Sequence, residues 1–162
     1  MPPSQSHVHA EIGRLISMLA RIWRRESDQA LSDHGLSYAM AIPLLVLSRQ
    51  GENVRQGVLA DELGIEGPSL VRLVDLLQSE GLVERREDPT DRRAKTLHLT
   101  TTGEAKVEEI NRVLRRVRAS LLKDIGSEEL AVTFETLQRI EQRASRLQDA
   151  KTAPAKTAPE AK

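Results

Sequence analysis

The sequence predicts a mainly α-helical fold with one small β-hairpin, and two observations support this. Much of the chain consists of stretches whose apolar side chains recur every three or four positions, the period of an amphipathic helix. The stretch LVERREDPTDRRAKTLHLTTTGE differs, because two short strands at residues 82–86 and 95–99 flank a charged loop. Two helical patterns joined by a tight glycine-containing turn precede it. Helix, turn, helix and hairpin in this order predict a winged helix-turn-helix.

The first predicted helix covers residues 11–33. Its apolar side chains, among them Ile12, Leu15 and Leu19, fall three or four positions apart and form one stripe. Gly35 is a typical residue to follow the end of a helix. The preceding segment contains Pro and Ser residues, so residues 1–10 are predicted to be a disordered arm.

The second predicted helix begins after Ser37, a good N-cap, and runs to about residue 49, with Gly51 as its stop signal. Pro43 lies inside this pattern, where it lacks the N–H that would bond to the carbonyl of Ala39. This predicts a kink in the helix or a displaced start.

The helix-turn-helix is predicted from the glycine and proline residues that mark where its helices begin and end. Residues 56–63 form the first helix, with Leu59 facing inward and Gly64 closing it. Gly67 and Pro68 open the next helix, where the missing N–H of proline costs nothing, and Gly81 ends it. The inward stripe of this second helix is Leu70 or Val71, Leu73, Val74 and Leu77, which leaves Ser69, Arg72, Asp75 and Gln78 facing outward.

Two further helices are predicted after the hairpin. Thr100 or Thr101 with Glu104 resembles a capping box that starts a long helix, whose narrow apolar seam suits packing against another helix. A last helix starts near Ser127. Residues 150–162 repeat a Lys-Thr-Ala-Pro unit and are predicted to be disordered. The seam comprises Val107, Ile110, Leu114, Val117 and Leu121, and the stripe of the last helix comprises Leu130, Phe134, Leu137, Ile140, Ala144 and Leu147.

The segment DPTDRRAKTLHLTTTGE resembles the wing and following helix cap of the MarR (multiple antibiotic resistance regulator) family of transcription factors. The family pattern there is roughly Asp-Pro-x-Asp-Arg-Arg followed by Leu-Thr-x-x-Gly. The upstream run LADELGIEGPSLVRLVDLLQSEGLVERR is similar to the family's helix-turn-helix, and the likeness in helix order extends over residues 11–149. The wing motif is specific, whereas many regulator families share the helix-turn-helix.

The resemblance implies one domain over residues 11–149, with a winged unit at about 37–100 flanked by dimerisation helices at about 11–33 and 101–149. We therefore expect a homodimer that places two recognition helices roughly 34 to 36 Å apart on a pseudo-palindromic operator. The expected interface residues are Ile12, Leu15, Leu19, Leu114, Val117, Leu121, Phe134 and Leu137.

The expected partner is a double-stranded DNA operator. By resemblance, Arg93 lies at the wing tip and enters the minor groove, and Asp91 is placed to hold this arginine or a neighbour as a wing organiser. Ser69 and Arg72 lie near the recognition-helix N-terminus, the part that contacts base edges. The alternatives are a solvated hairpin of mixed charge and, for Gln56, an ordinary exposed helix surface. The predicted DNA-binding set is Gln56, Pro68, Ser69, Arg72, Asp91, Arg92 and Arg93.

The net charge is zero, with 24 basic and 24 acidic residues, which at first sight argues against DNA binding. The local distribution matters more, because basic residues gather in the wing region. Acidic residues dilute them there, so we expect modest non-specific affinity with a strong salt dependence. The basic residues of the wing region are Arg85, Arg86, Arg92, Arg93 and Lys95.

A ligand site is suggested by Trp23 and Tyr38, the chain's single Trp and single Tyr. They fall on the first two helices, which in the resembled family border a small-molecule pocket. Such rings can stack on a small aromatic acid effector and donate a hydrogen bond to its carboxylate. The alternative is that Trp23 packs in the subunit interface and Tyr38 caps the core.

Other classes of function have little support in the sequence. With no cysteine, disulfide frameworks and thiol redox sensing are excluded, and the spacing of the four histidines predicts no metal site. His98 alternates with Leu97 and Leu99, which places it on the solvent face of a wing strand. Neither a nucleophile elbow nor a phosphate-binding glycine loop is present, so we expect no enzyme and no cofactor. Without a membrane span or a secretion signal, a soluble cytoplasmic protein is expected.

The sequence therefore predicts a DNA-binding transcriptional regulator, by resemblance a repressor that a small aromatic or phenolic ligand releases from its operator. Two alternatives remain open. One is a winged-helix module that binds protein, against which the arginine-bearing wing argues. The other is a constitutive regulator without an effector.

Overall fold

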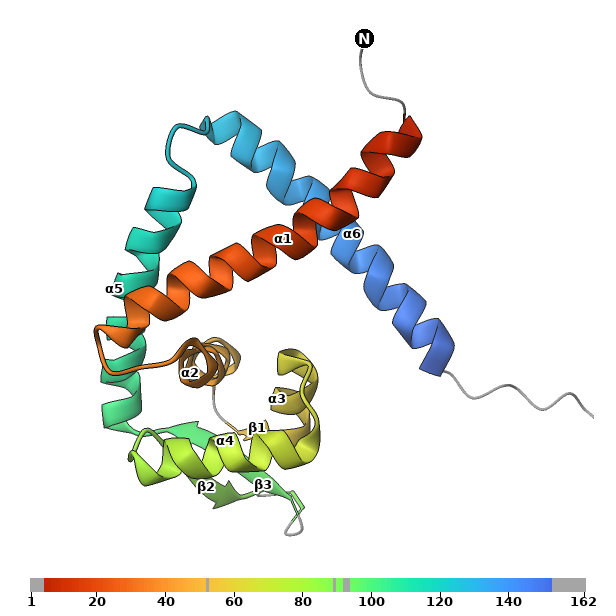
Figure 1. Cartoon of the computed structure of the whole chain (residues 1–162). Coiled ribbons are helices and arrows are strands. Elements are labelled where there is room, and N and C mark those ends of the chain that lie inside the picture. Colours follow the sequence, from red (N-terminus) through yellow and green to blue (C-terminus); the bar gives the residue numbers. More distant parts are fainter. Residues whose placement is uncertain (1–4, 52, 89, 92–93, 153–162) are drawn as a thin grey trace, which may run out of the picture. The chain divides into compact units, whose positions relative to one another are not determined.

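The computed structural model describes residues 5–51, 53–88, 90–91 and 94–152, with the backbone alone for residues 148–152. It is mostly helical with one small antiparallel sheet, as predicted (Figure 1). Among the described helices, none is both long and apolar enough to cross a membrane. The elements are α1 (Gln5–Ser32), α2 (Tyr38–Gln50), β1 (Val54–Arg55), α3 (Gln56–Leu63), α4 (Gly67–Ser79), β2 (Val83–Glu87), β3 (Lys95–Leu99), α5 (Thr101–Leu121) and α6 (Ser127–Thr152).

The chain divides into two compact units, one up to Leu121 and one from Leu122 onward. The first unit contains the helix-turn-helix, the sheet and the hydrophobic core. The second is essentially α6. Every described side chain of α6 except Leu130 is exposed or nearly so, which leaves this helix without a core of its own.

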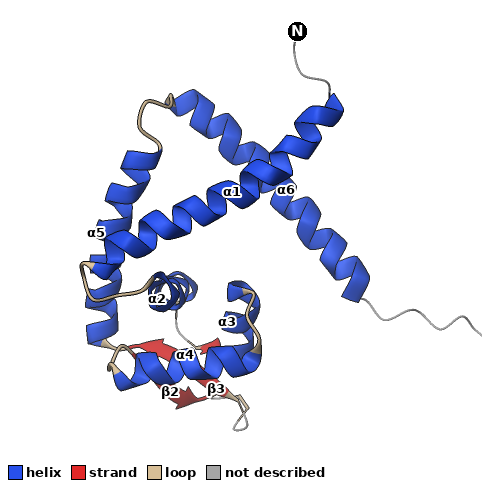
Figure 2. Ribbon diagram, in the orientation of Figure 1, coloured by secondary structure: helices blue, strands red, loops and turns tan. Residues whose placement is uncertain are grey.

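The winged helix-turn-helix is confirmed, with α3 at the predicted residues. The turn between α3 and α4 is made at Gly64, whose φ of 62° is left-handed and suits glycine. In Figure 2 the strands lie alongside α4, and β2 contacts this helix. Leu70, not Val71, belongs to the inward stripe of α4, since Leu70 is buried and Val71 is exposed.

The sheet has one more strand than the predicted hairpin. The short β1 pairs with β3 in antiparallel register, Val54 opposite Leu97, which gives the strand order β1-β3-β2. β3 is therefore the central strand. The sequence could not predict β1, because a strand of two residues is too short to show an alternating pattern.

His98 corrects the sequence analysis, which placed it on the solvent face of a wing strand. Its side chain is only 7% exposed, and its Nε2 lies 3.0 Å from the buried Oγ1 of Thr96. The reason is that β3 is covered on both faces, because Thr96, Leu97 and His98 are all buried in succession. A strand buried on both sides loses the contrast on which the alternation argument depends.

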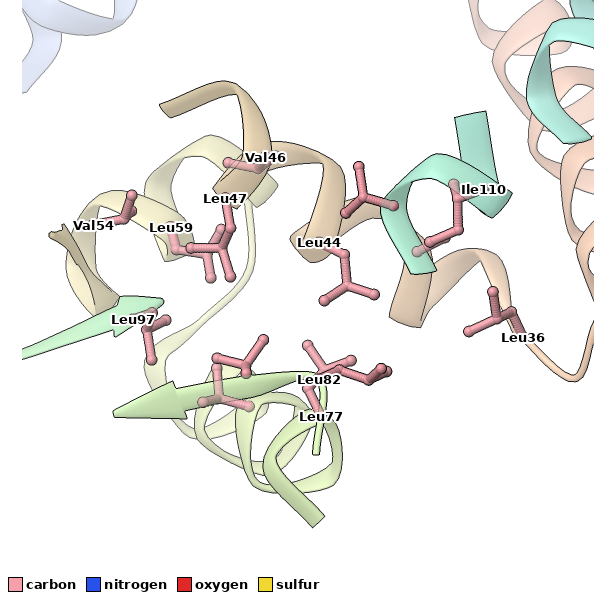
Figure 3. Packing of buried hydrophobic residues seen from close by; sticks show 14 of the residues in the cluster. Leu36, Leu44, Val46, Leu47, Val54, Leu59, Leu77, Leu82, Leu97 and Ile110 are labelled. Atoms are coloured by element: carbon pink, nitrogen blue, oxygen red, sulfur yellow. The ribbon is translucent and has the colours of Figure 1, made fainter. Parts of the chain in front are cut away.

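The hydrophobic core joins helices and sheet in the first unit. Figure 3 shows side chains from α2, α3, α4, α5 and the sheet that point toward one another. Leucine dominates this core, in agreement with an aromatic content of only 2% in the chain. The most deeply buried residues include Leu31, Leu44, Leu59, Leu77, Leu97 and Ile110.

The apolar seam of α5 is covered in part by this chain itself, and not by a second subunit. Val107, Ile110 and Leu114 on α5 are buried within this chain's own core, since α5 packs against α1 and α2. The periodicity identified the apolar face correctly but could not say that the same chain covers it. Val117 and Leu121, farther along α5, are half-buried and remain candidates for an interface.

Two helix boundaries differ from the predicted ones. The first helix begins at Gln5, so residues 5–10 are helical where a disordered arm was expected, and residues 1–4 lie outside the described chain. Val8 extends the apolar stripe one turn before Ile12, which explains the earlier start. The last helix continues to Thr152, three residues past the predicted domain end, and residues 153–162 lie outside the described chain.

Pro43 does not displace the start of its helix. The segment Tyr38–Gln50 is helical on both sides of it, and Ser37 caps the predicted end by accepting a 3.2 Å hydrogen bond from the Met40 N–H. Pro43 itself is buried. Packing of α2 in the core therefore outweighs the single backbone hydrogen bond that proline removes.

Candidate DNA-binding surface

The recognition helix α4 presents an exposed polar face. Pro68, Ser69 and Arg72 are exposed at its N-terminal end, as the sequence analysis expected. Arg72 forms no hydrogen bond or ion pair within the described part of the chain, so its guanidinium is available to an external acceptor. Gln56, at the first residue of α3, is half-buried. These four residues therefore lie on the two helices of one helix-turn-helix.

The wing loop is organised by Asp88, which the sequence analysis did not select. Its Oδ2 accepts a 2.6 Å bond from Arg55 Nε, and its Oδ1 accepts bonds from the N–H and hydroxyl of Thr90 at 2.8 and 2.6 Å. The carboxylate is almost fully buried. The hydrogen bond from Arg55 and those from Thr90 hold the pKa of Asp88 far below its usual range, so it stays ionised at physiological pH.

Asp91 was expected to organise the wing by holding Arg93 or a neighbour, and this stays a prediction because Arg92 and Arg93 lie outside the described residues. The backbone of Asp91 belongs to the turn around Asp88, with its N–H donating to Asp88 Oδ1 and its carbonyl accepting from the Ala94 N–H. An Asp followed two residues later by Thr is a turn signal that could have identified Asp88. Arg55 lies 33 residues away in sequence and gave no such signal.

Arg92 and Arg93, the expected wing-tip residues, lie outside the described residues. The described arginines of the wing strands have partners on the protein. Arg86 pairs with Glu84 within β2. Arg85 instead forms an ion pair with Asp75 and donates a hydrogen bond to Gln78, both on the recognition helix.

An open cavity of about 690 Å³ lies between α1, α2 and the α3–α4 segment. Arg21, Arg24 and Asp28 line it from α1, and Tyr38 lines it from α2. The Arg24 guanidinium lies 5.9 Å from the centre of the Tyr38 ring, a cation–π arrangement, and the Tyr38 N–H donates a 2.7 Å bond to Asp28. Trp23, the other expected ligand residue, is half-buried and does not line this cavity.

Exposed apolar side chains form stripes on the helices at the two ends of the chain. Ile12, Leu15 and Leu19 are exposed on α1, and Phe134 and Leu137 on α6, with Phe134 61% exposed. Such stripes on amphipathic helices typically mark surfaces that another helix covers. Of the predicted interface residues, Leu114 alone is buried in the core.

Comparison with known proteins identifies the family. Residues 34–94 match the model of the MarR family. The crystal structure of the transcriptional regulator PA3341 is 38% identical, covers 83% of this chain and 98% of its own, and superposes with a TM-score of 0.77. A MarR-family regulator from Rhodococcus sp. RHA1 is 28% identical, with 85% and 96% covered and a TM-score of 0.73. A MarR variant from E. coli complexed with operator DNA is 25% identical, with 85% and 99% covered and a TM-score of 0.73.

Proposed function

The chain belongs to the MarR family of DNA-binding transcriptional regulators, and on this premise we propose that it is a homodimeric repressor released from a pseudo-palindromic operator by a small aromatic acid. The observation that carries the proposal is the exposed Arg72 on α4, which has no partner among the described residues and lies on the helix beside the wing strands β2 and β3. The MarR variant of similar fold was solved with operator DNA, which supports the same partner for this chain. Binding to chromosomal DNA implies that it acts in the cytoplasm.

Loss of Arg72 tests base recognition. Arg72→Ala should weaken operator binding by about 1 to 3 kcal/mol and relax preference at one base pair, because an arginine fork bonds guanine O6 and N7. Binding curves against operators with single base-pair changes, at fixed salt, measure both effects. Arg115→Ala, which removes an exposed arginine from α5, is the control. Unchanged base preference in Arg72→Ala would contradict this assignment.

The homodimer is tested on α6. Phe134→Asp should shift the protein toward monomer and weaken operator binding, because a charge would replace an aromatic anchor of the proposed interface. Val132→Asp is the matched control: Val132 is 65% exposed, but at 100° per residue it lies roughly on the opposite side of the helix. Light scattering at micromolar concentration measures the mass. A monomeric unaltered protein, or equal effects of the two substitutions, would contradict the proposed interface.

The cavity beside Tyr38 supports ligand control. It presents cationic Arg21 and Arg24 next to an aromatic ring and apolar side chains such as Ile42, a combination that suits a small aromatic carboxylate. Since the cavity lies between the long helix α1 and the winged unit, a ligand there that favours a DNA-incompetent arrangement would shift the population away from the operator.

Salicylate is a suitable probe for this site. Arg24→Gln should weaken salicylate binding about tenfold or more, because it removes a charge-assisted hydrogen bond. Arg14→Gln is the control, since Arg14 lies on the same helix outside the cavity and pairs with Glu11. Trp23 fluorescence and operator release are the two readouts. If a panel of aromatic acids changes neither signal, a constitutive regulator is the better description.

A further inference from the structure

One described ion pair connects the wing to the recognition helix. Arg85, on β2, directs Nη1 to Oδ1 of Asp75 and to Oε1 of Gln78, each at 2.6 Å. Asp75 and Gln78 are three residues apart on α4 and therefore lie on one edge of that helix. The Arg85 side chain is 23% exposed, against 57% for Asp75, so the pair lies at the boundary between core and solvent.

Other described cations of the hairpin bond within the sheet or its loop. Arg86 pairs with Glu84 on its own strand, and Lys95 pairs with Glu87 across the hairpin. Both pairs stay within the hairpin, whereas the Arg85 pair connects the hairpin to α4. Among the described cations of the wing strands, Arg85 is the one that bonds to the recognition helix.

Asp75 places a negative charge on the recognition helix. An exposed carboxylate on a DNA-reading helix repels phosphate, so by itself it should weaken binding. Arg85 offsets this charge and is held in return by Asp75 and by the Gln78 amide oxygen. A partly exposed ion pair contributes little to stability. Its effect on geometry can be larger, because the helix and the wing must contact neighbouring grooves at the same time. If the wing moves relative to the helix in the free protein, fixing it on DNA costs conformational entropy and weakens binding.

We propose that Arg85 is a positioning residue: through Asp75 and Gln78 it sets the wing relative to the recognition helix, so that both reach DNA in one arrangement. This deepens the DNA-binding function and rests on it. The competing explanation is that Arg85 leaves Asp75 and contacts a phosphate directly. The two explanations differ in the sign expected for Asp75→Ala. Positioning requires Asp75, so its loss weakens binding, whereas direct phosphate contact makes Asp75 a competitor, so its loss tightens binding.

A double-mutant cycle separates the two explanations. The operator is first selected from random-sequence DNA by the unaltered protein, and affinities are then measured for Arg85→Ala, Asp75→Ala and the double variant at several salt concentrations. Positioning predicts that each single change weakens binding about tenfold, and that the double variant is no weaker than Arg85→Ala alone. Additive effects, with tighter binding of Asp75→Ala and a salt slope lower by about one in Arg85→Ala, would overturn the inference.

Arg86→Ala is the charge-matched control, because it removes the same charge from the next residue of the strand without touching α4. A readout without DNA is amide hydrogen exchange of β2, which should be faster in Arg85→Ala than in Arg86→Ala while the melting temperatures stay similar. Equal exchange in the two variants would overturn the inference. Failure of the unaltered protein to enrich any DNA sequence would instead refute the proposed function, and the exchange experiment would still judge the role of Arg85.

Discussion

Gly103→Ala should destabilise the first unit by about 3 kcal/mol or more, a large share of the stability of an ordinary domain. A Cβ at this position would lie 2.0 Å from the carbonyl oxygen of Leu82 and 3.3 Å from a methyl carbon of Leu99. The closest atom belongs to the backbone, so rotation of a side chain cannot relieve the overlap. The chain entering the wing would have to move away from the start of α5.

That movement would also break the cap of α5. Thr100 Oγ1 accepts a 2.9 Å bond from the Gly103 N–H and donates a 2.6 Å bond to the Gly81 carbonyl, while the Thr100 N–H donates to Leu82 O at 3.1 Å. Loss of such a cap typically costs about 1 kcal/mol on its own. These bonds lock the end of the helix-turn-helix to the first turn of α5, so the damage should extend to the whole unit.

Urea unfolding of Gly103→Ala measures the effect, with Gly57→Ala as its control. A Cβ on Gly57 meets nothing within 4 Å, and this residue lies in α3 without a positive φ. The same substitution there should be neutral or stabilise by up to about 1 kcal/mol, since alanine is the better helix former. Equal stability of the two variants would show that the Leu82–Gly103 approach is looser than described.

The helix-turn-helix could be predicted from sequence because its signals are local. Gly64, Pro68 and Gly81 each act within a turn of their own position, so the bounds of α3 and the opening of α4 followed from them. The capping box at α5 was predicted only in part. Thr100 does cap the helix, but its N–H bonds to Leu82 O and not to Glu104, because the neighbouring strand supplies a backbone acceptor that no local pattern reveals.

The features that the sequence analysis missed depend on residues far apart in the chain. Asp88 was not selected because its main partner, Arg55, comes from a strand too short to be predicted. His98 was placed on the wrong side because successive residues of β3 are buried on both faces of the sheet, and this burial depends on elements distant in sequence that pack against the strand. The bonds from Arg85 to α4 likewise require the packed positions of two elements.

The apolar seam of α5 also depends on residues far apart in the chain, and here the consequence can be measured. Periodicity identified Val107, Ile110 and Leu114 as one apolar face, and the sequence analysis assigned Leu114 to the contact between subunits. In the structure these residues are buried within one chain, where Leu114 is 8% exposed, while Phe134 on α6 is largely exposed. A spacing pattern identifies an apolar face but not the element that covers it. Charge substitutions at the two sites should therefore have different consequences.

Leu114→Asp should abolish the cooperative fold of the first unit, and not merely separate two folded subunits. The substitution removes about 1.5 to 3 kcal/mol of apolar burial and places a carboxylate in a leucine-rich core, which costs several kcal/mol more. Together these approach the total stability of a typical domain, about 5 to 15 kcal/mol. Helical circular dichroism and urea unfolding should show a largely unfolded or only weakly cooperative chain.

Phe134→Asp provides the contrast, because an exposed position tolerates a charge in the folded chain. It should keep native helicity and a cooperative transition of the winged unit while its solution mass falls. Leu114→Ala separates lost packing from buried charge, and it should cost about 2 to 5 kcal/mol yet leave a measurable unfolding transition. If Leu114→Asp were instead a fully helical, cooperatively folding monomer, Leu114 would belong to the interface between subunits, and its place in the core of one chain would be wrong.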